Sequence, residues 1–291
     1  MGTLFLVATP IGNLDDISVR ALRTLREARL IAAEDTRRTK QLLTHFGITR
    51  PLTSYFEHNK LAKLDTILAA LDDGSVALVS DAGTPNLSDP GYELVRAALA
   101  AGHAVTPIPG PSALLAALVA SGLPSDAFVY LGFLPRKAGE RQRLLESVAD
   151  EPRTLVAFEA PHRLLEALAA VEAVLGDRPV AVARELTKLH EEIVRAPASQ
   201  ARRHFEQKEI LGEITLVIGG AATAQPAAAW DAPRVRAELE KRLSAGAHKK
   251  DAARQVAALA NWPQRDVYRL ATEAGGLAAA GPPAAGAEDD S

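Results

Sequence analysis

The chain has 291 residues, of which 47% are hydrophobic and 24% charged, and its formal net charge is −3. This composition is typical of a globular chain long enough for two packed domains, and it excludes a mainly disordered protein. The sequence contains no cysteine, which excludes disulfides, thiolate nucleophiles and cysteine-ligated metal sites.

No segment is long and apolar enough to predict a membrane span. The apolar run over residues 108–123 is interrupted by Pro, Gly and Ser before the roughly 20 residues that a span needs. The N-terminal apolar run follows no basic region, so it indicates a buried strand and not a secretory signal. We therefore expect a cytoplasmic protein with no membrane partner.

Alternating apolar runs and helical patterns over the first 110 residues predict βαβ units and a mostly parallel sheet. Ser18 is the expected cap of the first helix, and Gly102 is expected to end the last one. The predicted strands cover residues 4–8, 30–33, 76–80 and 104–108, and the predicted helices cover 18–28, 60–71 and 92–101. The run over 76–80 is the most strand-like of these and is the expected central strand.

The pattern changes after Pro109-Gly110-Pro111, which indicates a second lobe. The predicted helices of this lobe cover residues 112–120, 163–175 and 198–207, and its predicted strands cover 128–133, 154–158, 179–184 and 213–219. We therefore expect two α/β lobes, over residues 1–110 and 111–220.

The C-terminal part has a different composition. Residues 221–232 are rich in Ala, Pro, Thr and Gln, which predicts a linker. Residues 233–274 predict a small basic helical domain with short helices over 233–243, 250–260 and 264–274, in an arrangement compatible with a helix-turn-helix. Residues 234–269 hold nine Lys and Arg against four acids. Residues 275–291 are of low complexity and are predicted to be disordered.

Several common active-site motifs are absent. The sequence has no G-x-x-x-x-G-K-[ST] phosphate loop, no G-x-G-x-x-G turn after the first strand and no G-x-S-x-G elbow. None of its seven histidines forms a helical His-x-x-x-His pair, so we expect no metal. Kinases, ordinary dinucleotide enzymes and serine hydrolases are therefore disfavoured.

Loops that follow strands are the expected place for a ligand in an α/β sheet. Residues 80–91 contain two prolines, two glycines, Asp81 and Asp89. Small residues let the backbone approach a ligand closely, and the two carboxylates suit a positively charged partner or ribose hydroxyls better than a polyphosphate. Residues 158–163 and 184–188 also place charges just beyond a strand, which catalysis or buried ion pairs would explain equally well.

Six segments have the order and spacing of one family. They are Thr9-Pro10-Ile11-Gly12-Asn13-Leu14, Ala33-Glu34-Asp35-Thr36-Arg37, Ser80-Asp81-Ala82-Gly83-Thr84-Pro85, Pro109-Gly110-Pro111-Ser112-Ala113, Phe158-Glu159-Ala160-Pro161-His162-Arg163 and Arg184-Glu185-Leu186-Thr187-Lys188. Over about residues 3–272 the chain resembles the ribosomal RNA small subunit methyltransferase I family, which has the tetrapyrrole-methylase fold. Six ordered motifs are far more specific than any one of them.

The resemblance implies a two-lobed α/β fold with a mostly parallel N-terminal sheet, a mixed C-terminal sheet and a small helical C-terminal extension. It also implies an enzyme, usually a homodimer, that uses S-adenosyl-L-methionine to methylate the ribose 2′-oxygen of a cytidine in the decoding region of 16S rRNA in the small ribosomal subunit. The cofactor would lie in the cleft between the lobes, with the turn over residues 9–13 bordering the methyl-transfer site.

The family's cofactor-binding positions carry over residue by residue. The loop over residues 81–85 would touch the methionine part, and positions 158, 159, 186, 213 and 214 would hold the adenosine. The full set is Pro10, Asp81, Gly83, Thr84, Pro85, Ser112, Ala113, Phe158, Glu159, Leu186, Glu213 and Ile214. Candidates for RNA phosphate contacts are Arg20, Arg23, Arg37, Arg38, Lys249 and Lys250. The arginines that begin at residue 20 could equally form a solvent-exposed helix face with no binding role.

A ribose hydroxyl must lose its proton, so a general base is expected. The catalytic candidates are Asp35, His58 and Lys188, with Glu34 and Glu57 as neighbouring options, because each lies in a loop or strand end expected to face the cleft. The sequence does not choose among them.

Three positions depart from the family pattern. Asp15 stands where Gly is usual, Asn86 where Gly or an aliphatic residue is common, and Leu211 where a basic residue is usual. If Asp15 needs a positive φ, a strained or reshaped turn is expected there.

Two alternatives remain open. One is a tetrapyrrole C-methyltransferase of the same fold, whose polycarboxylate substrate would favour a compact basic cleft; the basic segment over 234–269 favours RNA instead. The other is an RNA-binding assembly factor without catalysis, against which the intact loops 81–85 and 110–112 argue.

Overall fold

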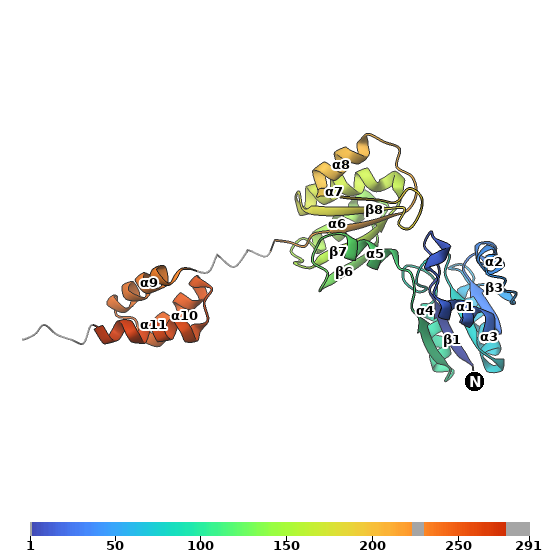
Figure 1. Cartoon of the computed structure of the whole chain (residues 1–291), viewed down its shortest axis with the longest axis horizontal. Coiled ribbons are helices and arrows are strands. Elements are labelled where there is room, and N and C mark those ends of the chain that lie inside the picture. The colour runs from blue at the N-terminus through green and yellow to red at the C-terminus, as the bar shows by residue number, and fades with distance from the viewer. Residues whose placement is uncertain (1, 223–229, 278–291) are drawn as a thin grey trace, which may run out of the picture. The chain divides into compact units, whose positions relative to one another are not determined.

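A computed structural model describes residues 2–222 and 230–277 of the chain (Figure 1). The chain divides into two compact units, Met1–Ala221 and Ala222–Ser291. Most of the expected linker, residues 223–229, and most of the expected tail, residues 278–291, lie outside the described residues. No helix in the described ranges is long and apolar enough to cross a membrane.

The first sheet of the larger unit is parallel throughout, as the βαβ pattern predicted. Its strands are β1 (Thr3–Val7), β2 (Leu30–Ala33), β3 (Leu52–Ser54), β4 (Val76–Val79) and β5 (Ala104–Ile108), in the order β3-β2-β4-β1-β5. The fully buried β4 is the central strand, as expected. The sequence did not predict β3, because three half-buried residues give no apolar run of strand length.

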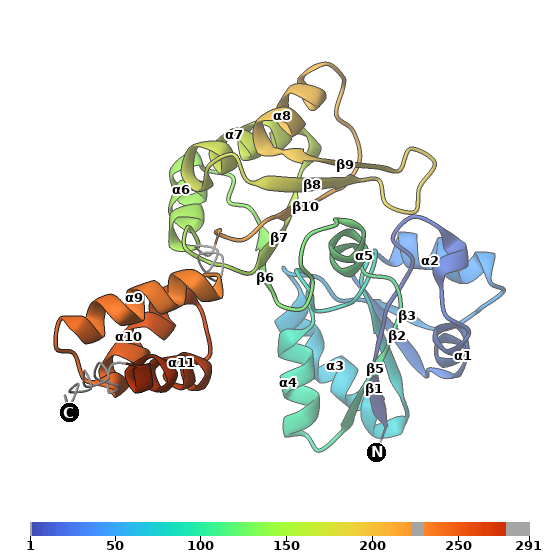
Figure 2. The same cartoon turned by 60° about the vertical axis from the view of Figure 1, so that its left-hand side comes forward.

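Helices cover both faces of this sheet. The helices are α1 (Val19–Glu27), α2 (Thr36–His45), α3 (Lys60–Asp73) and α4 (Tyr92–Ala100), preceded by the single 3₁₀ turn η1 (Leu14–Asp16). Side chains of α1 and α2 share one hydrophobic cluster with the sheet, and those of α3 and α4 share another on the opposite face (Figure 2). Ser18 caps α1 as predicted, accepting a hydrogen bond from the Ala21 N–H at 3.0 Å.

Helix α2 was not predicted, and its sequence explains why. Its ten residues, Thr-Arg-Arg-Thr-Lys-Gln-Leu-Leu-Thr-His, bury only Thr39 and Leu43, so the apolar periodicity is weak. The Asp35 side chain begins the helix by accepting a hydrogen bond from the Arg37 N–H at 2.8 Å. The N-cap residue Asp35 was therefore the feature of the sequence that could have predicted this helix.

The second sheet is mixed, as expected. Its strands are β6 (Phe128–Phe133), β7 (Thr154–Glu159), β8 (Pro179–Arg184), β9 (Glu192–Pro197) and β10 (Ile214–Ile218), in the order β6-β7-β10-β8-β9. Among the described strand pairs of this sheet, β6–β7 is parallel and the other three are antiparallel. The edge strand β9 was missed, because its half-buried residues Glu-Ile-Val-Arg-Ala-Pro form no continuous apolar run.

Helices also cover both faces of the second sheet (Figure 1). One face carries α6 (Ala138–Ser147), α7 (Leu164–Leu175) after the 3₁₀ turn η2 (Pro161–Arg163), and α8 (Ala198–Glu206). The other face carries α5 (Ala113–Ala120), which Ser112 caps. Helix α6 was not predicted, since only Arg141 and Leu145 of its ten residues are buried.

The smaller unit consists of α9 (Ala232–Ser244), α10 (Lys249–Ala260) and α11 (Gln264–Leu277) in its described part. These helices share a core that is rich in alanine, including Ala252, Ala253 and Val256, which lets them approach closely. The turn between α10 and α11 holds Asn261 at φ 51°. The indole N–H of Trp262 donates to the Trp230 carbonyl at 2.7 Å, which ties the turn to the start of the unit.

Candidate functional site

Loops from the carboxyl ends of the first sheet's strands converge at one edge. Thr9, after β1, and Gly83, after β4, exchange two backbone hydrogen bonds of 2.9 Å each. The Thr84 hydroxyl donates to the Pro111 carbonyl at 3.3 Å, which ties the β4 loop to the segment after β5. The Asp35 N–H donates to Asp81 Oδ1 at 2.9 Å, which adds the segment after β2.

The second lobe brings its strand ends to the same place. A Cβ added at Gly12 would lie 2.4 Å from Lys188 Cγ and 3.1 Å from the Leu186 carbonyl oxygen, so the turn after β1 packs closely on the segment after β8. Lys188 Nζ lies 2.8 Å from Glu185 Oε1 and 3.3 Å from Glu213 Oε2. A residue with a Cβ at position 12 would collide with Lys188, so only glycine lets the turn after β1 pack this closely on the segment after β8.

Two adjoining cavities lie between these loops. An apolar chamber of about 320 Å³ is lined mainly by Ile11, Phe133, Phe158, Ala183, Leu186 and Ile214. An acidic chamber of about 220 Å³ is lined by Glu34, Asp81 and Asp89 and by the small residues of the β4 loop. The two chambers share Ala113, Phe133, Phe158 and Glu213, so they form one continuous cleft.

Ten of the twelve residues expected to bind the cofactor line this cleft. They are Asp81, Gly83, Thr84, Ser112, Ala113, Phe158, Glu159, Leu186, Glu213 and Ile214. Pro85 is buried within the β4 loop and lines neither chamber. Pro10 lines a different cavity, described below. Phe133 lines both chambers although the sequence analysis did not single it out; its place at the end of a predicted strand was the available signal.

The apolar chamber contains one buried charged group with a free acceptor. Glu159 Oε1 accepts from the Ala160 N–H at 2.7 Å and pairs with Arg163 Nη2 at 2.5 Å. Its other oxygen, Oε2, is buried and has no hydrogen-bond partner among the described residues. Burial raises the pKa of Glu159, while the Ala160 N–H and Arg163 oppose that rise. An unpaired buried acceptor is costly, so it indicates a ligand that donates a hydrogen bond here.

The acidic chamber gathers three carboxylates at the ends of β2 and β4. Burial raises the pKa of Asp89 to about 6, and the nearby charge of Glu34 adds to that rise. Burial also raises the pKa of Glu34. Asp81 Oδ2 lies 3.5 Å from Arg38 Nη1, which offsets part of the negative charge. A cationic ligand group would relieve the remaining repulsion.

Positive φ angles occur in the loop after β4 and not at Asp15, where the sequence predicts a strained turn if a positive φ is needed. Asp15 lies in η1 and is absent from the residues with positive φ, so its turn needs no glycine. Asn86 instead adopts φ 71° and Ser88 φ 63°. Asn is one of the few side chains that tolerate this region, so Asn86 is compatible with its backbone conformation. The third departure, Leu211, is exposed, and its carbonyl accepts from Arg184 Nη1 at 3.3 Å.

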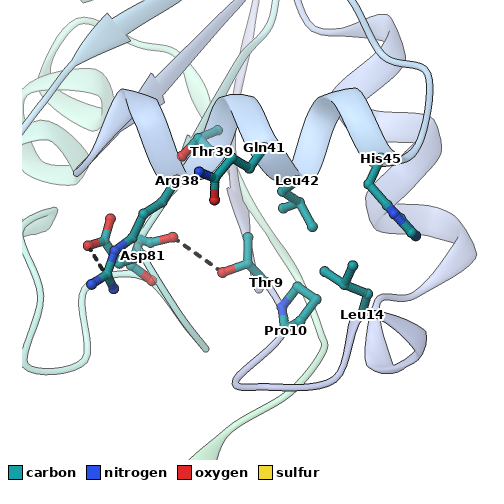
Figure 3. A pocket seen from close by; sticks show the side chains of 10 residues that line it. Thr9, Pro10, Leu14, Arg38, Thr39, Gln41, Leu42, His45 and Asp81 are labelled. Atoms are coloured by element: carbon teal, nitrogen blue, oxygen red, sulfur yellow. Dashed lines mark hydrogen bonds and ion pairs between the residues drawn. The ribbon is translucent and has the colours of Figure 1, made fainter.

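A third cavity of about 330 Å³ lies between the turn after β1 and one face of α2, and we call it the α2 cavity (Figure 3). Its lining residues are Thr9, Pro10, Leu14, Arg38, Thr39, Gln41, Leu42, His45, Ser80 and Asp81. It shares Arg38 and Asp81 with the acidic chamber. Arg38 and Asp81 lie at one end of the cavity, and Leu14 and His45 lie at the other (Figure 3).

None of the three catalytic candidates lines these three cavities. The side chain of Asp35 bonds to Arg37, and these hydrogen bonds hold the pKa of Asp35 at about 2. His58 is exposed in the segment between β3 and α3. Burial lowers the pKa of Lys188, but Glu185 and Glu213 outweigh it and raise that pKa. Glu34 does line the acidic chamber.

The candidates for RNA contact fall into two groups. Arg20 and Arg23 are exposed on α1, and Arg37 and Arg38 are exposed on α2. Lys249 and Lys250 are exposed in the first turn of α10, in the smaller unit. Arg38 also lines two cavities, which the sequence alone did not indicate. Within residues 2–222 and 230–277, no group of three or more acidic or histidine side chains could hold a metal ion.

Residues 3–202 match the family described as Tetrapyrrole (Corrin/Porphyrin) Methylases. The chain belongs to this family. It is 48% identical over 275 residues to a Synechocystis sp. member named ribosomal RNA small subunit methyltransferase I, covering 94% of this chain and 98% of the relative. It is 52% identical over 221 residues to the Thermotoga maritima protein of that name, covering 76% and 99%.

Solved structures of this methylase family share the fold. A uroporphyrin-III C-methyltransferase from Thermus thermophilus, solved as a complex with S-adenosylhomocysteine, matches 75% of this chain and 97% of its own. The TM-score is 0.52 at 20% sequence identity. At this distance the likeness supports the architecture of the methylase family and leaves the substrate to other arguments.

Proposed function

We propose that this chain transfers a methyl group from S-adenosyl-L-methionine to the ribose 2′-oxygen of a cytidine in the decoding region of 16S rRNA. One observation carries the proposal: the continuous cleft joins an apolar chamber to an acidic one at the strand ends of a methylase. The name shared by relatives at about half identity supports ribosomal RNA as the substrate class. Such a reaction belongs in the cytoplasm, where ribosomal subunits are found.

The cleft fits the two unlike ends of the cofactor. Phe133 and Phe158, whose ring centroids are 5.4 Å apart, offer flat apolar surface to an adenine ring. The unpartnered Glu159 Oε2 is an acceptor for an amino or hydroxyl group of the adenosine. The carboxylates of the acidic chamber suit the cationic methionine end. When bound, the cofactor supplies a methyl group already activated on a positively charged sulfur.

The protein's own contribution is positioning and removal of a proton. Holding reacting groups in line can lower a barrier by roughly 7–11 kcal/mol in favourable cases. A general base adds a factor of about 10² to 10⁴. Glu34 and Asp89 are the better bases, because burial raises the pKa of both towards neutrality. Asp35 and Lys188 are weaker candidates, since the first has a lowered pKa and the second a raised one.

The remaining candidates take supporting roles in this proposal. Lys188 is 3.3 Å from Glu213, which lines both chambers, so it positions that side chain. His58 is retained as a base only for an RNA-bound form, because it is exposed. The exposed arginines of α1 and α2 and the lysines of α10 contact RNA phosphates. We also propose that the chain forms a homodimer. Sedimentation velocity would measure this oligomeric state.

The test is tritium transfer from labelled S-adenosyl-L-methionine to small ribosomal subunits that lack the modification, followed by nuclease mapping of the label. We expect the label in 16S rRNA as a 2′-O-methyl cytidine. Cofactor binding with no transfer to RNA would overturn the substrate assignment and favour a tetrapyrrole substrate. Absence of both binding and transfer would favour an RNA-binding assembly factor.

A further inference from the structure

We infer that the α2 cavity receives the target nucleotide of the RNA, with its base unstacked from its neighbours and its ribose at the end next to the acidic chamber. The inference rests on the proposed function as an RNA methyltransferase and assigns the RNA side of the same site. Sequence-specific RNA binding commonly uses such splayed-out bases, which hydrogen-bond along their edges.

The position of the cavity supports this assignment. Arg38 and Asp81 line both the α2 cavity and the acidic chamber, so a ligand in one reaches the border of the other. The Thr9 hydroxyl donates to the Ser80 carbonyl at 3.2 Å, and Thr9 is paired with Gly83 through the backbone. These bonds fix the turn after β1 beside the loop expected to hold the methionine part. A ribose at this border would therefore meet the methyl donor.

The walls of the cavity match the two kinds of surface on a nucleobase. Pro10, Leu14 and Leu42 form an apolar part that suits the flat faces of the ring (Figure 3). Gln41 and His45, one turn apart on α2, form a polar part. The Gln41 amide both donates and accepts, as reading a base edge requires, and within the described part of the chain no hydrogen bond occupies it. The volume of about 330 Å³ is that of a small-molecule site.

Charges around the cavity favour entry of a nucleoside and exclude the backbone that carries it. Lys40 and Arg37, which is paired with Asp35, line an open depression outside the cavity, together with Gln41 and His45. These cations suit the phosphates on either side of the target nucleotide. The acidic chamber at the inner end repels phosphate. The neutral base and ribose can therefore enter while the phosphates stay at the surface.

The first test compares two substitutions of the exposed Gln41. Gln41→Trp fills the cavity, and Gln41→Leu removes only the hydrogen-bonding amide. We expect Gln41→Trp to lower kcat/KM for ribosomal subunits by at least about 100-fold and Gln41→Leu by about 10-fold, the range of one good base contact. Cofactor affinity should stay within about twofold of the original chain. Gln142→Leu, the same change at an exposed site on α6, is the matched control.

Methyl transfer by Gln41→Trp at the rate of the original chain would overturn the inference. A loss of cofactor binding in Gln41→Leu would overturn it too, because the amide would then serve the cofactor and not the RNA. If the original chain itself transfers no methyl to RNA, the proposed function fails before this comparison begins, so the two failures are distinguishable.

A second test reads the occupant of the cavity without relying on activity. The photoreactive residue p-benzoylphenylalanine is placed at Leu14, which lies at the outer end of the cavity (Figure 3). We expect a cross-link to the methylated nucleotide or its immediate neighbour, mapped by primer extension. The same residue at the exposed Leu99 of α4 is the control. Cross-links at distant nucleotides, or equal cross-linking from both positions, would overturn the assignment.

Discussion

The two lobes contribute opposite chemistry to one cleft. The first lobe, with its parallel sheet, places the carboxylates of Glu34, Asp81 and Asp89 at its strand ends. The second lobe, with its mixed sheet, contributes mainly apolar side chains, among them Phe158 and Ile214. A ligand with one apolar and one cationic end therefore has a single favourable orientation. In the proposed function, this contrast between the lobes would orient the cofactor in the cleft.

Blocking the junction of the two chambers should have the largest effect. Ala113 lines both chambers at the start of α5, so Ala113→Trp would fill the passage between them. We expect the affinity for S-adenosyl-L-methionine, measured by isothermal titration calorimetry, to fall by at least about 100-fold. The indole would prevent one cofactor molecule from occupying both chambers at the same time. Leu115→Trp, on the exposed side of the same helix, should bind normally. Undiminished binding by Ala113→Trp would mean that the chambers act separately.

Sequence reasoning reached the chambers more fully than the α2 cavity, for a physical reason. Asp81 follows β4, Ser112 follows β5 and Phe158 lies at the end of β7, so the ends of predicted strands mark all three positions. Gln41 and His45 lie on α2, which buries too few apolar side chains to show helical periodicity. Without the helix, nothing in the sequence indicates that they share a face.

The sequence also could not supply the distances that change protonation. Asp35 and Glu34 are adjacent in the chain, yet the first has a lowered pKa and the second a raised one. The difference comes from Arg37, which folds back onto Asp35, and from burial of Glu34. Both causes depend on the packed structure and on no local pattern.

The acidic chamber should make cofactor binding depend on pH through Asp89. Because the pKa of Asp89 is about 6, the carboxyl gains a proton as pH falls from 7 to 5 and loses its attraction for a cation. We expect affinity for S-adenosyl-L-methionine to weaken about 5- to 10-fold over that range. Asp89→Asn should bind more weakly at pH 7 and show a flatter profile.

The same pKa has the opposite consequence for stability of the free protein. The pKa of Asp89 is raised above its ordinary 3.8, so the folded state favours the protonated form. Its contribution to stability is complete below about pH 4 and is lost as pH rises through about 6. Asp89→Asn should remove this dependence in urea titrations at pH 4, 5, 6 and 7. A parallel loss of stability and affinity with falling pH would contradict the assignment to Asp89.

The smallest effect is expected in the three-helix unit. Lys249 and Lys250 are exposed at the start of α10, where phosphate contacts would be screened by salt. We expect Lys249→Ala with Lys250→Ala to weaken RNA binding by about 3- to 10-fold at moderate salt and to reduce the salt dependence of binding by one to two counterions, that is by about 1–2 in slope. Filter binding at several salt concentrations measures both quantities, and cofactor affinity should not change. Lys137→Ala with Arg143→Ala, at two exposed residues just before and within α6, matches the change in charge and controls for it. If the double variant shows the same salt slope as the original chain, these lysines do not contact the RNA. RNA contact would then depend on the arginines of α1 and α2. Both helices belong to the first lobe, which supplies the carboxylates of the acidic chamber.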